Sequence, residues 1–554
     1  MLWQFQRTSK TAVASNRKTL LRILRDNADS EFGRQHRFDQ LADDPTAAAY
    51  RRTVPLSAYP DYRDAITRME LGETGILTSD EVLFFALSSG TTGAAKLVPT
   101  TKRHHGFTFK YMGTVVQGVI ASELHRGRTD RGVDLMSFAG QQQLSPGGVP
   151  IGSATAEAVR RMARIVPHLW NSPIEIYTLE HLPSARYIHA LYGLRNRENQ
   201  FVEAVFAPRL LEWIREVVDR WDELVADVRN GTLSDDLEID DQVRQQVLAD
   251  TPADPARAAE LEAATKDGFA GFLPRVWPAM THLMTISTGS FALYVPALRE
   301  YVGDLPIYSP SYGATESFIG VNLWPDRPGR YVMATDPSYF EFIPIARADE
   351  DQPPTVDIEG IAAGDVYELV VTNHAGFYRY RMGDVVRVVD RLGEAPVIEF
   401  LYRRGTQFDV TGEKTSEEQV AAAVAQLRER HPELDVEDYT SAVDAAASPP
   451  RYVIYLELVA REGSEPIDEA TLERWAVEFD ELLVQANPMV VEFREGGYLG
   501  RPRLAIVRPG TFVRLADLAL AGEHAPSRNQ LKTPRRVDGA DQVELLGSAV
   551  VVSA

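Results

Sequence analysis

The residues Val82 to Leu87 (VLFFAL) run directly into Ser88 to Lys96 (SSGTTGAAK). The first part is a short apolar run and predicts a buried strand. Glycines allow the second part to turn tightly and to direct backbone N–H groups at an anion, while its Ser and Thr hydroxyls donate further hydrogen bonds. Lys96 adds a full positive charge. The combination is typical of a loop that binds phosphate.

The spacing of this loop differs from that of a Walker motif. Gly90 and Gly93 are separated by two residues, whereas the Walker pattern needs four residues before its Gly-Lys-Ser/Thr end. Taken alone, the segment is hardly distinguishable from a flexible turn between a strand and a helix. Further segments downstream that suit the same nucleotide favour the phosphate loop.

The composition is that of a large globular protein. With 554 residues the chain is too long for one core, and about three or four folding units are expected. Its hydrophobic (44%) and charged (25%) fractions are ordinary for a soluble protein. The formal charge of −21 argues against nucleic acid or an anionic membrane as a partner. A bound ATP would therefore need a local basic pocket.

The chain has no cysteine, which excludes disulfides, thiol catalysis and thiolate metal sites. No apolar run approaches the ~18–20 residues that are needed to cross a bilayer. The first residues carry no apolar core of the signal-peptide type. We therefore expect a cytoplasmic protein without a membrane partner, and a monomer.

Hydrophobic periodicity predicts alternating helices and strands, followed by a strand-rich region. Helices are expected at 10–27, 102–123 and 200–227, and an acidic surface excursion with helical stretches at 232–267. Strands are expected at 82–87, 283–287, 307–309, 332–334, 339–343, 367–372, 385–389 and 397–401. The pattern favours a mixed α/β architecture.

Past about residue 412 the pattern restarts. It predicts helices at 415–428, 467–486 and 512–520, and strands at 452–459 and 503–507. The glycines of Arg404-Gly405 and Thr411-Gly412 predict a flexible linker between the two regions. We predict a large N-terminal α/β domain, residues 1–410, and a smaller, mobile α+β domain, residues 411–554.

A second chemistry-bearing segment runs from Ser311 to Ser317 (SYGATES). A tyrosine beside a glycine can lay its ring against a flat heterocycle, as Tyr312 beside Gly313 would. Thr315 can donate a hydrogen bond to a phosphate, and Glu316 is an oxygen ligand suited to Mg²⁺. Taken alone, the segment is interpreted as a polar turn after a strand.

A third segment, Gly376 to Val385 (GFYRYRMGDV), contains Asp384 directly after Gly383. A carboxylate at the start of a strand can accept hydrogen bonds from both ribose hydroxyls. Arg379 and Arg381 alternate with tyrosines, which places both cations on one strand face. For Arg379 we favour a solvated or salt-bridged surface residue.

Two more polar segments follow. Residues 401–417 include Arg403 and the sequence GEKTSEE, which contains Lys414. Near the C-terminus, Asn529 to Arg535 (NQLKTPR) contains Lys532. A charge run of this kind is usually a solvated loop. A lysine on a mobile domain could instead stabilise charge at an α-phosphate as pyrophosphate leaves.

These segments, in this order, resemble the adenylate-forming superfamily, and within it the Gretchen Hagen three family of acyl-acid amido synthetases. The phrases that carry the resemblance are SSGTTGAAK, ISTGSFALYVPALREYVGDLPIYSPSYGATES, YELVVTNHAGFYRYRMGDVVRV, GEKTSEE and NQLKTPR. They span nearly the whole chain. Their combination is highly specific, whereas each short motif taken singly is not.

The resemblance implies adenylation of a carboxylic acid by ATP with Mg²⁺, then transfer of the acyl group to an amine, usually that of an amino acid. It also implies a role for each matched residue. The residues that would hold the phosphates are Ser88, Ser89, Thr91, Thr92 and Lys96, with Thr315 at the α-phosphate. Tyr312, beside Gly313, would stack on adenine, Asp384 and Arg403 would contact ribose, and Glu316 would bind Mg²⁺. Lys414 matches the hinge lysine of the family, and Lys532 matches its catalytic C-terminal lysine.

Two other functions stay open at this point: an acid–coenzyme A ligase of the same superfamily, and a non-catalytic protein that binds a nucleotide or an acid. The acyl substrate and the acceptor are also open. Candidates for an anchor of the acyl carboxylate are Lys102, Arg103, His104, His105 and Lys110, and Phe138, Phe291 and Phe318 are candidates for pocket or core residues.

Overall fold

The computed structural model describes residues 1–44, 46–87, 96–124, 131–137, 143–152, 154–161, 166–404, 410, 415–459, 467–487, 489–495, 499–520 and 532–553. Of these, residues 1–87 and 96–400 form one compact unit, the large unit, and those from Leu401 onward form the small unit. The domain boundary at 410/411 stays a prediction. Every helix in the described ranges is too short or too polar to traverse a bilayer.

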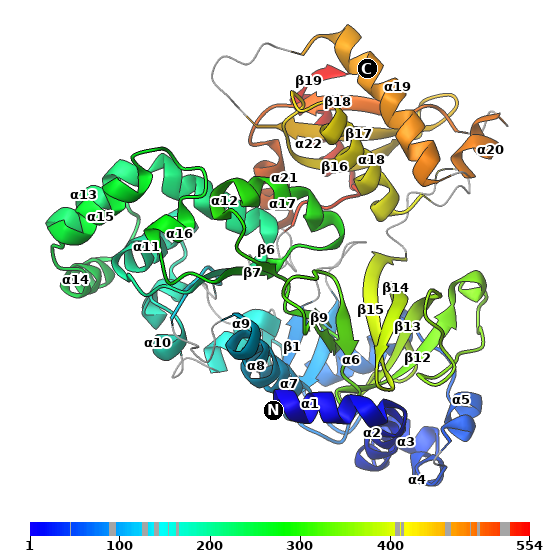
Figure 1. Ribbon diagram of the computed structural model, residues 1–554. Coiled ribbons are helices and arrows are strands. Elements are labelled where there is room, and N and C mark those ends of the chain that lie inside the picture. Colours follow the sequence, from blue (N-terminus) through cyan, green and yellow to red (C-terminus); the bar gives the residue numbers. More distant parts are fainter. Residues whose placement is uncertain are drawn as a thin grey trace. The chain divides into compact units, whose positions relative to one another are not determined.

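In its described part, the large unit contains three β-sheets (Figure 1). The first has the order β2-β1-β5-β4, with β1 at Val82–Leu87, β2 at Leu97–Thr101, β4 at Gln143–Leu144 and β5 at Pro150–Gly152. The strand predicted at 82–87 is confirmed. Because β2 returns antiparallel to β1, Leu87 lies opposite Leu97, and the two ends of the predicted phosphate loop lie side by side.

The second sheet is parallel, with the order β3-β6-β7-β8. Its strands are β3 at Val133–Asp134, β6 at Phe201–Phe206, β7 at His282–Ile286 and β8 at Ile307–Tyr308. The helix predicted over 200–227 is wrong at its start, because helix α12 begins only at Ala207. A short apolar run suits a buried strand as well as a helix, and pairing with β3 and β7 makes residues 201–206 a strand.

The third sheet has the order β12-β13-β14-β15-β11-β10-β9. The strands are β9 at Ser311–Ala314, β10 at Ser317–Val321, β11 at Tyr331–Met333, β12 at Ser338–Pro344, β13 at Val366–Asn373, β14 at Tyr380–Leu392 and β15 at Ala395–Arg403. The predicted strand-rich region is confirmed. The pair β9 and β10 was interpreted as a turn, because Gly313 and the polar residues around it have low strand propensity.

Helices surround these sheets (Figure 1). They are α1 at Leu2–Thr8, α2 at Ala12–Asp26, α3 at Glu31–Gln35, α4 at Phe38–Leu41, α5 at Ala48–Thr53, α6 at Arg63–Glu70, α7 at Lys102–Lys110, α8 at Gln117–Val119, α9 at Ala154–Arg161, α10 at Val166–Leu169, α11 at Leu182–Arg195, α12 at Ala207–Asp219, α13 at Trp221–Asn230, α14 at Asp241–Asp250, α15 at Pro255–Thr265, α16 at Leu273–Val276 and α17 at Val295–Val302. The predicted helix 102–123 is confirmed, with π-helical turns at Tyr111–Val116 and Ile120–Leu124. Helix α2 buries Leu20, Ile23 and Leu24 in the core of the third sheet.

The small unit has one sheet of order β16-β17-β18-β19 in its described residues. Its elements are α18 at Glu417–Arg430, β16 at Val436–Asp444, β17 at Arg451–Leu458, α19 at Glu469–Ala486, α20 at Met489–Glu495, β18 at Arg503–Val507, α21 at Thr511–Leu520, α22 at Ala540–Ala549 and β19 at Val550–Ser553. The five predicted elements are confirmed. The two edge strands, β16 and β19, were not predicted. The mixed α/β class is correct.

Arg379 lies in the core, not on the surface as we favoured, although the salt bridge is confirmed. It precedes β14 with a left-handed φ of 48°, a strained conformation for a residue with a side chain. Its guanidinium pairs with Glu341 at 3.0 Å, and the two side chains are 7% and 1% exposed. Nη1 donates to the carbonyls of Arg51 and Val54, and Nη2 to Thr355 Oγ1. These contacts hold the backbone where β14 begins, and we call them the Arg379 clamp.

Replacing Arg379 with leucine should lower the free energy of unfolding by about 3–5 kcal/mol, because the Glu341 carboxylate would stay buried without its cation. Urea unfolding measures the change. The matched control is Arg347→Leu, which removes an exposed pair with Glu350 and should change the stability little. Equal effects of the two substitutions would contradict the structural role of the Arg379 clamp.

Candidate active site

The hairpin of β9 and β10 carries four of the predicted site residues. Tyr312 and Gly313 lie in β9, and Thr315 and Glu316 form the turn. Gly313 is exposed, and a Cβ built on it would meet no atom within 4 Å. The hairpin therefore presents an open stretch of backbone beside the Tyr312 ring.

Asp384 reaches this hairpin from β14. The pairing of β13 with β14 shifts between Glu368 and Val370, and Gly383 has a φ of 79°. This is a β-bulge, a feature that re-aims a side chain. Asp384 is 2% exposed, and its Oδ2 accepts a hydrogen bond from the Tyr312 hydroxyl at 2.7 Å.

The contact requires a strongly curved sheet. Strands β15, β11 and β10 separate β14 from β9 in the strand order, so a flat sheet would put them about 19 Å apart. The ring of Tyr312 also lies 5.8 Å from the ring of Tyr331 in β11 and 5.6 Å from that of Phe400 in β15. The Tyr312 side chain therefore extends across the concave face of the sheet, where it packs near the rings of Tyr331 and Phe400.

Glu316 is 4% exposed. The Tyr380 hydroxyl donates to its Oε1 at 3.5 Å, and Asn373 Nδ2 donates to its backbone carbonyl at 2.8 Å. Among the residues that the structure describes, no Lys or Arg forms an ion pair with it. A buried carboxylate needs a positive partner, and Mg²⁺ is commonly held by one carboxylate together with substrate phosphates. Glu316 thus fits a magnesium ligand.

Lys96 precedes β2 and holds its Nζ 5.5 Å from the centre of the Tyr59 ring. The Tyr59 hydroxyl accepts from Leu97 N at 2.9 Å. Burial is the main cause that raises the pKa of Tyr59, and the Glu316 carboxylate contributes to the same direction. Tyr59 therefore contacts the end of the predicted phosphate loop at Lys96 and Leu97.

The other predicted site residues lie outside the described ranges or have no described contact with the hairpin. Ser88, Ser89, Thr91, Thr92 and Lys414 lie outside the described residues. Arg403 is the last residue of β15. Lys532, expected to be exposed, is partly buried. The segment that follows it is anchored, because Arg535 is buried, pairs with Asp438 and donates to the Tyr439 carbonyl.

Most basic residues of the cluster in α7 either form ion pairs within the protein or are buried. Arg103 pairs with Asp26 and Lys110 with Asp336. Burial lowers the pKa of His104 to about 4, so its ring is neutral at pH 7. Burial also lowers the pKa of His105.

The aromatic candidates for an acyl pocket are core residues where the structure describes them. Phe318 stacks on Tyr111 with ring centres 4.7 Å apart, and Phe291 stacks on Phe206 at 4.9 Å. Phe138 lies outside the described residues. The structure therefore accounts for Phe318 and Phe291 as packed core residues.

Two residues that contact the predicted site segments, Tyr59 and Tyr380, were not predicted as site residues. Neither carries a local signal. Tyr59 lies in a turn-rich segment upstream of the loop, and Tyr380 is one of two tyrosines that alternate with arginines. Tertiary packing alone brings Tyr59 to Lys96 and Leu97, and Tyr380 to Glu316.

Tyr312→Phe should lower the free energy of unfolding by about 1–3 kcal/mol, because it removes a donor from a buried carboxylate oxygen. Urea unfolding without nucleotide measures this. Tyr301→Phe, at a partly exposed ring in α17, is the control and should change stability little. If the two substitutions behave alike, the hydrogen bond to Asp384 does not organise the site.

Family models match the chain in three consecutive parts. The GH3 family N-terminal domain matches residues 1–307, the GH3 family central domain matches 331–403, and the GH3 family C-terminal domain matches 418–540. The central-domain match includes β14, whose Asp384 contacts the hairpin of β9 and β10. The C-terminal-domain match includes most of the small unit.

Curated relatives match over almost the whole length. The 4-substituted benzoates-glutamate ligase GH3.12 of Arabidopsis thaliana is 31% identical over 528 residues, which cover 91% of this chain and 89% of the relative. The indole-3-acetic acid-amido synthetase GH3.8 of Oryza sativa subsp. indica is 32% identical over 572 residues, covering 98% and 91%.

Solved structures agree with the sequence matches. A GH3.15 acyl acid amido synthetase superposes with a TM-score of 0.87 at 26% identity, covering 100% of this chain and 96% of that chain. A 2-hydroxyisobutyryl-CoA ligase shares the fold, with a TM-score of 0.53 at 11% identity, covering 96% and 90%. Since both the domain order and the full-length relatives agree, this chain belongs to the GH3 family of acyl-acid amido synthetases.

Proposed function

We propose that this chain uses ATP and Mg²⁺ to adenylate a carboxylic acid and then transfers the acyl group to the amine of an amino acid. The observation that carries the proposal is the contact of Tyr312 with Asp384 at 2.7 Å. It joins two segments to which the resemblance to the family gives adenine and ribose roles. Family membership supports the same reaction.

The chemistry explains why two steps are needed. A carboxylate and an ammonium ion pair with each other near neutral pH instead of reacting, because the carboxylate oxygen is a poor leaving group. In the first step the carboxylate oxygen forms a bond to the α-phosphorus, and the bond to the β-phosphate oxygen breaks. In the second step the amine nitrogen attacks the acyl carbon, AMP leaves with the bonding electron pair, and the nitrogen loses a proton.

The residues of the hairpin and of β14 would bind and orient the nucleotide. The Tyr312 ring packs near the rings of Tyr331 and Phe400, and we propose that it stacks on adenine. Asp384, whose Oδ2 accepts from Tyr312, is proposed to accept hydrogen bonds from ribose. Thr315 would contact the α-phosphate from the turn between β9 and β10.

Charge neutralisation is the main demand of the first step, because two anions approach each other. Mg²⁺ bound at Glu316 would supply Lewis-acid stabilisation of the phosphates. Lys96 would contribute positive charge at the end of the phosphate loop. Lys532 of the small unit is proposed as the lysine that stabilises the departing pyrophosphate.

The substrate classes follow from the relatives. One is named for 4-substituted benzoates and glutamate, and others for indole-3-acetic acid. We propose an apolar carboxylic acid as the acyl donor and an amino acid as the acceptor. A pyrophosphate-exchange assay with a panel of aromatic acids, followed by mass spectrometry of reactions with amino acids, tests this directly.

The same assay separates the alternatives. A thioester product with coenzyme A, and no amide, would show an acid–thiol ligase. Absence of exchange with every acid in the panel would favour a non-catalytic binding protein. The amide synthetase is favoured because the named full-length relatives are amide-forming ligases.

Lys532→Ala should slow acid-dependent pyrophosphate exchange by roughly 10²–10³-fold, the usual loss when one stabiliser of developing negative charge is removed. Circular dichroism should show an unchanged fold. The control is Lys266→Ala, at an exposed position after α15, which should exchange at the wild-type rate. Wild-type exchange by Lys532→Ala would refute the role of this lysine.

Glu316→Gln should raise the Mg²⁺ concentration for half-maximal exchange by at least about tenfold, because it replaces an anionic oxygen ligand with a neutral one. Exchange measured across a Mg²⁺ titration gives the value. Glu262→Gln, an exposed glutamate in α15, is the matched control. An unchanged Mg²⁺ dependence in Glu316→Gln would exclude this carboxylate as the ligand.

A further inference from the structure

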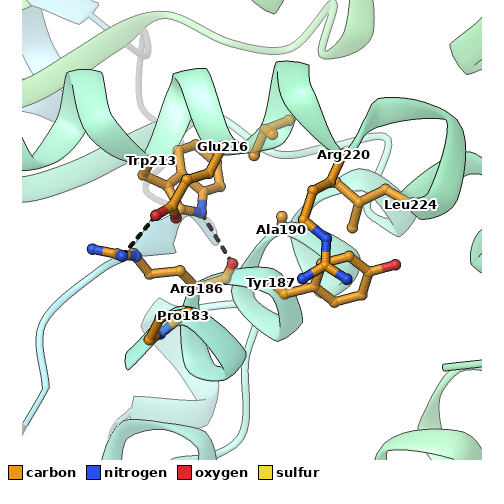
Figure 2. A pocket seen from close by; sticks show the side chains of 9 residues that line it. Pro183, Arg186, Tyr187, Ala190, Trp213, Glu216, Arg220 and Leu224 are labelled. Atoms are coloured by element: carbon orange, nitrogen blue, oxygen red, sulfur yellow. Dashed lines mark hydrogen bonds and ion pairs between the residues drawn. The ribbon is translucent and has the colours of Figure 1, made fainter. Parts of the chain in front are cut away.

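A pocket of about 130 Å³ lies between helices α11, α12 and α13 of the large unit (Figure 2). Its two guanidinium groups are neutralised by carboxylates of the chain itself. Arg186 pairs with Glu212 and Glu216, and Arg220 pairs with Glu223. We interpret these ion pairs as contacts that hold the three helices together.

A paired arginine of the small unit has a different setting, because it follows the lysine that we propose to be catalytic. Arg535 lies three residues after Lys532. It is 6% exposed, and its Nη1 pairs with the Asp438 carboxylate and donates to the Tyr439 carbonyl at 2.6 Å. The guanidinium carbon also lies 4.4 Å from the centre of the Tyr439 ring. One side chain thus holds its segment to β16 through three contacts.

The backbone on both sides of Arg535 pairs with the same strand. Ser441 N donates to the Arg535 carbonyl at 3.0 Å, and Val537 N donates to the Ser441 carbonyl at 2.8 Å. The Thr440 hydroxyl donates to the Pro534 carbonyl. The segment is therefore fixed along β16, at the edge of the sheet. We call the side-chain and backbone contacts together the Arg535 anchor.

The connection between the anchor and Lys532 is short and stiff. Only Thr533 separates Lys532 from Pro534. The proline ring fixes the φ of Pro534 and confines Thr533 to extended conformations. The Cα atoms of Lys532 and Arg535 are joined by three residue steps, which span at most about 11 Å. The backbone of Lys532 can therefore move little once Pro534 and Arg535 are held.

We propose that Arg535 is a positioning residue for Lys532, and that its pair with Asp438 keeps the lysine within reach of the α-phosphate during adenylation. The inference rests on the proposed function. A displacement of about 1 Å at a catalytic group can lower a rate by about 10²-fold, so loss of the anchor is costly for the first step. The second step releases AMP and no pyrophosphate, and it does not depend on the anchor.

The test measures the two steps of the full chain separately, beginning with benzoate and glutamate and continuing with the acid and amino acid of the panel that give product. Acid-dependent pyrophosphate exchange reports the first step. Aminolysis of the synthetic acyl-adenylate of the same acid, without ATP and followed by mass spectrometry, reports the second. Thermal unfolding shows whether each variant is folded.

Arg535→Leu should slow exchange by about 10²-fold and leave aminolysis within about twofold of wild type. A purely structural role would lower both rates together. The matched control is Arg536→Leu, at the next position, whose side chain pairs with exposed Asp538; both of its rates should equal those of wild type. Asp438→Asn keeps the shape of the side chain and removes the charge, so it should show the same selective loss, by at least about tenfold. It keeps the test decisive if Arg535→Leu fails to fold.

A double variant tests whether Arg535 acts through the lysine. Lys532→Ala combined with Arg535→Leu should exchange at the rate of Lys532→Ala alone, because the anchor has nothing left to position. If the two losses multiply instead, Arg535 acts independently of Lys532.

The positioning role is overturned by such multiplication, by exchange at the wild-type rate in Arg535→Leu, or by an equal fall of exchange and aminolysis. Each of these results leaves the proposed function intact, since wild type would still complete both steps. A wild-type chain that catalyses neither step would refute the proposed function, and the role of Arg535 with it.

Discussion

Arg379 and Glu341 form an ion pair in the core of the large unit, and the geometry of the residues that we propose to bind the nucleotide depends on it. Arg379 adopts a left-handed backbone conformation, which is stable only when its surroundings determine it fully. They do so here, because its guanidinium is held by Glu341, two carbonyls and Thr355. Its carbonyl also accepts from Ser57 N at 3.0 Å.

From this fixed point β14 leads to the site. Tyr380, the first residue of the strand, directs its hydroxyl toward Glu316. Three residues later the bulge at Gly383 turns Asp384 toward Tyr312. Both carboxylates are almost fully buried, and buried carboxylates are costly unless they gain hydrogen bonds or a cation. The clamp therefore provides the rigidity that such a site needs before any ligand arrives.

Local signals in the sequence were sufficient for much of the fold. Strand β1 was predicted with its observed bounds, and so was β18, because each is a short apolar run between turn residues. Residues 201–206 were misassigned because an apolar run of that length suits either element. Strands β9, β10, β16 and β19 were missed because their stability comes from pairing with neighbours, which periodicity does not record.

The sequence by itself determined the chemical inventory of the site and its family, since Tyr312, Thr315 and Glu316 lie within five residues and Asp384 follows a glycine in a recognisable phrase. Only the tertiary structure decided which of these groups meet. Tyr312 and Asp384 are 72 positions apart, and they touch because the sheet between them curves. Curvature is a collective property of seven paired strands, so no single segment could encode it.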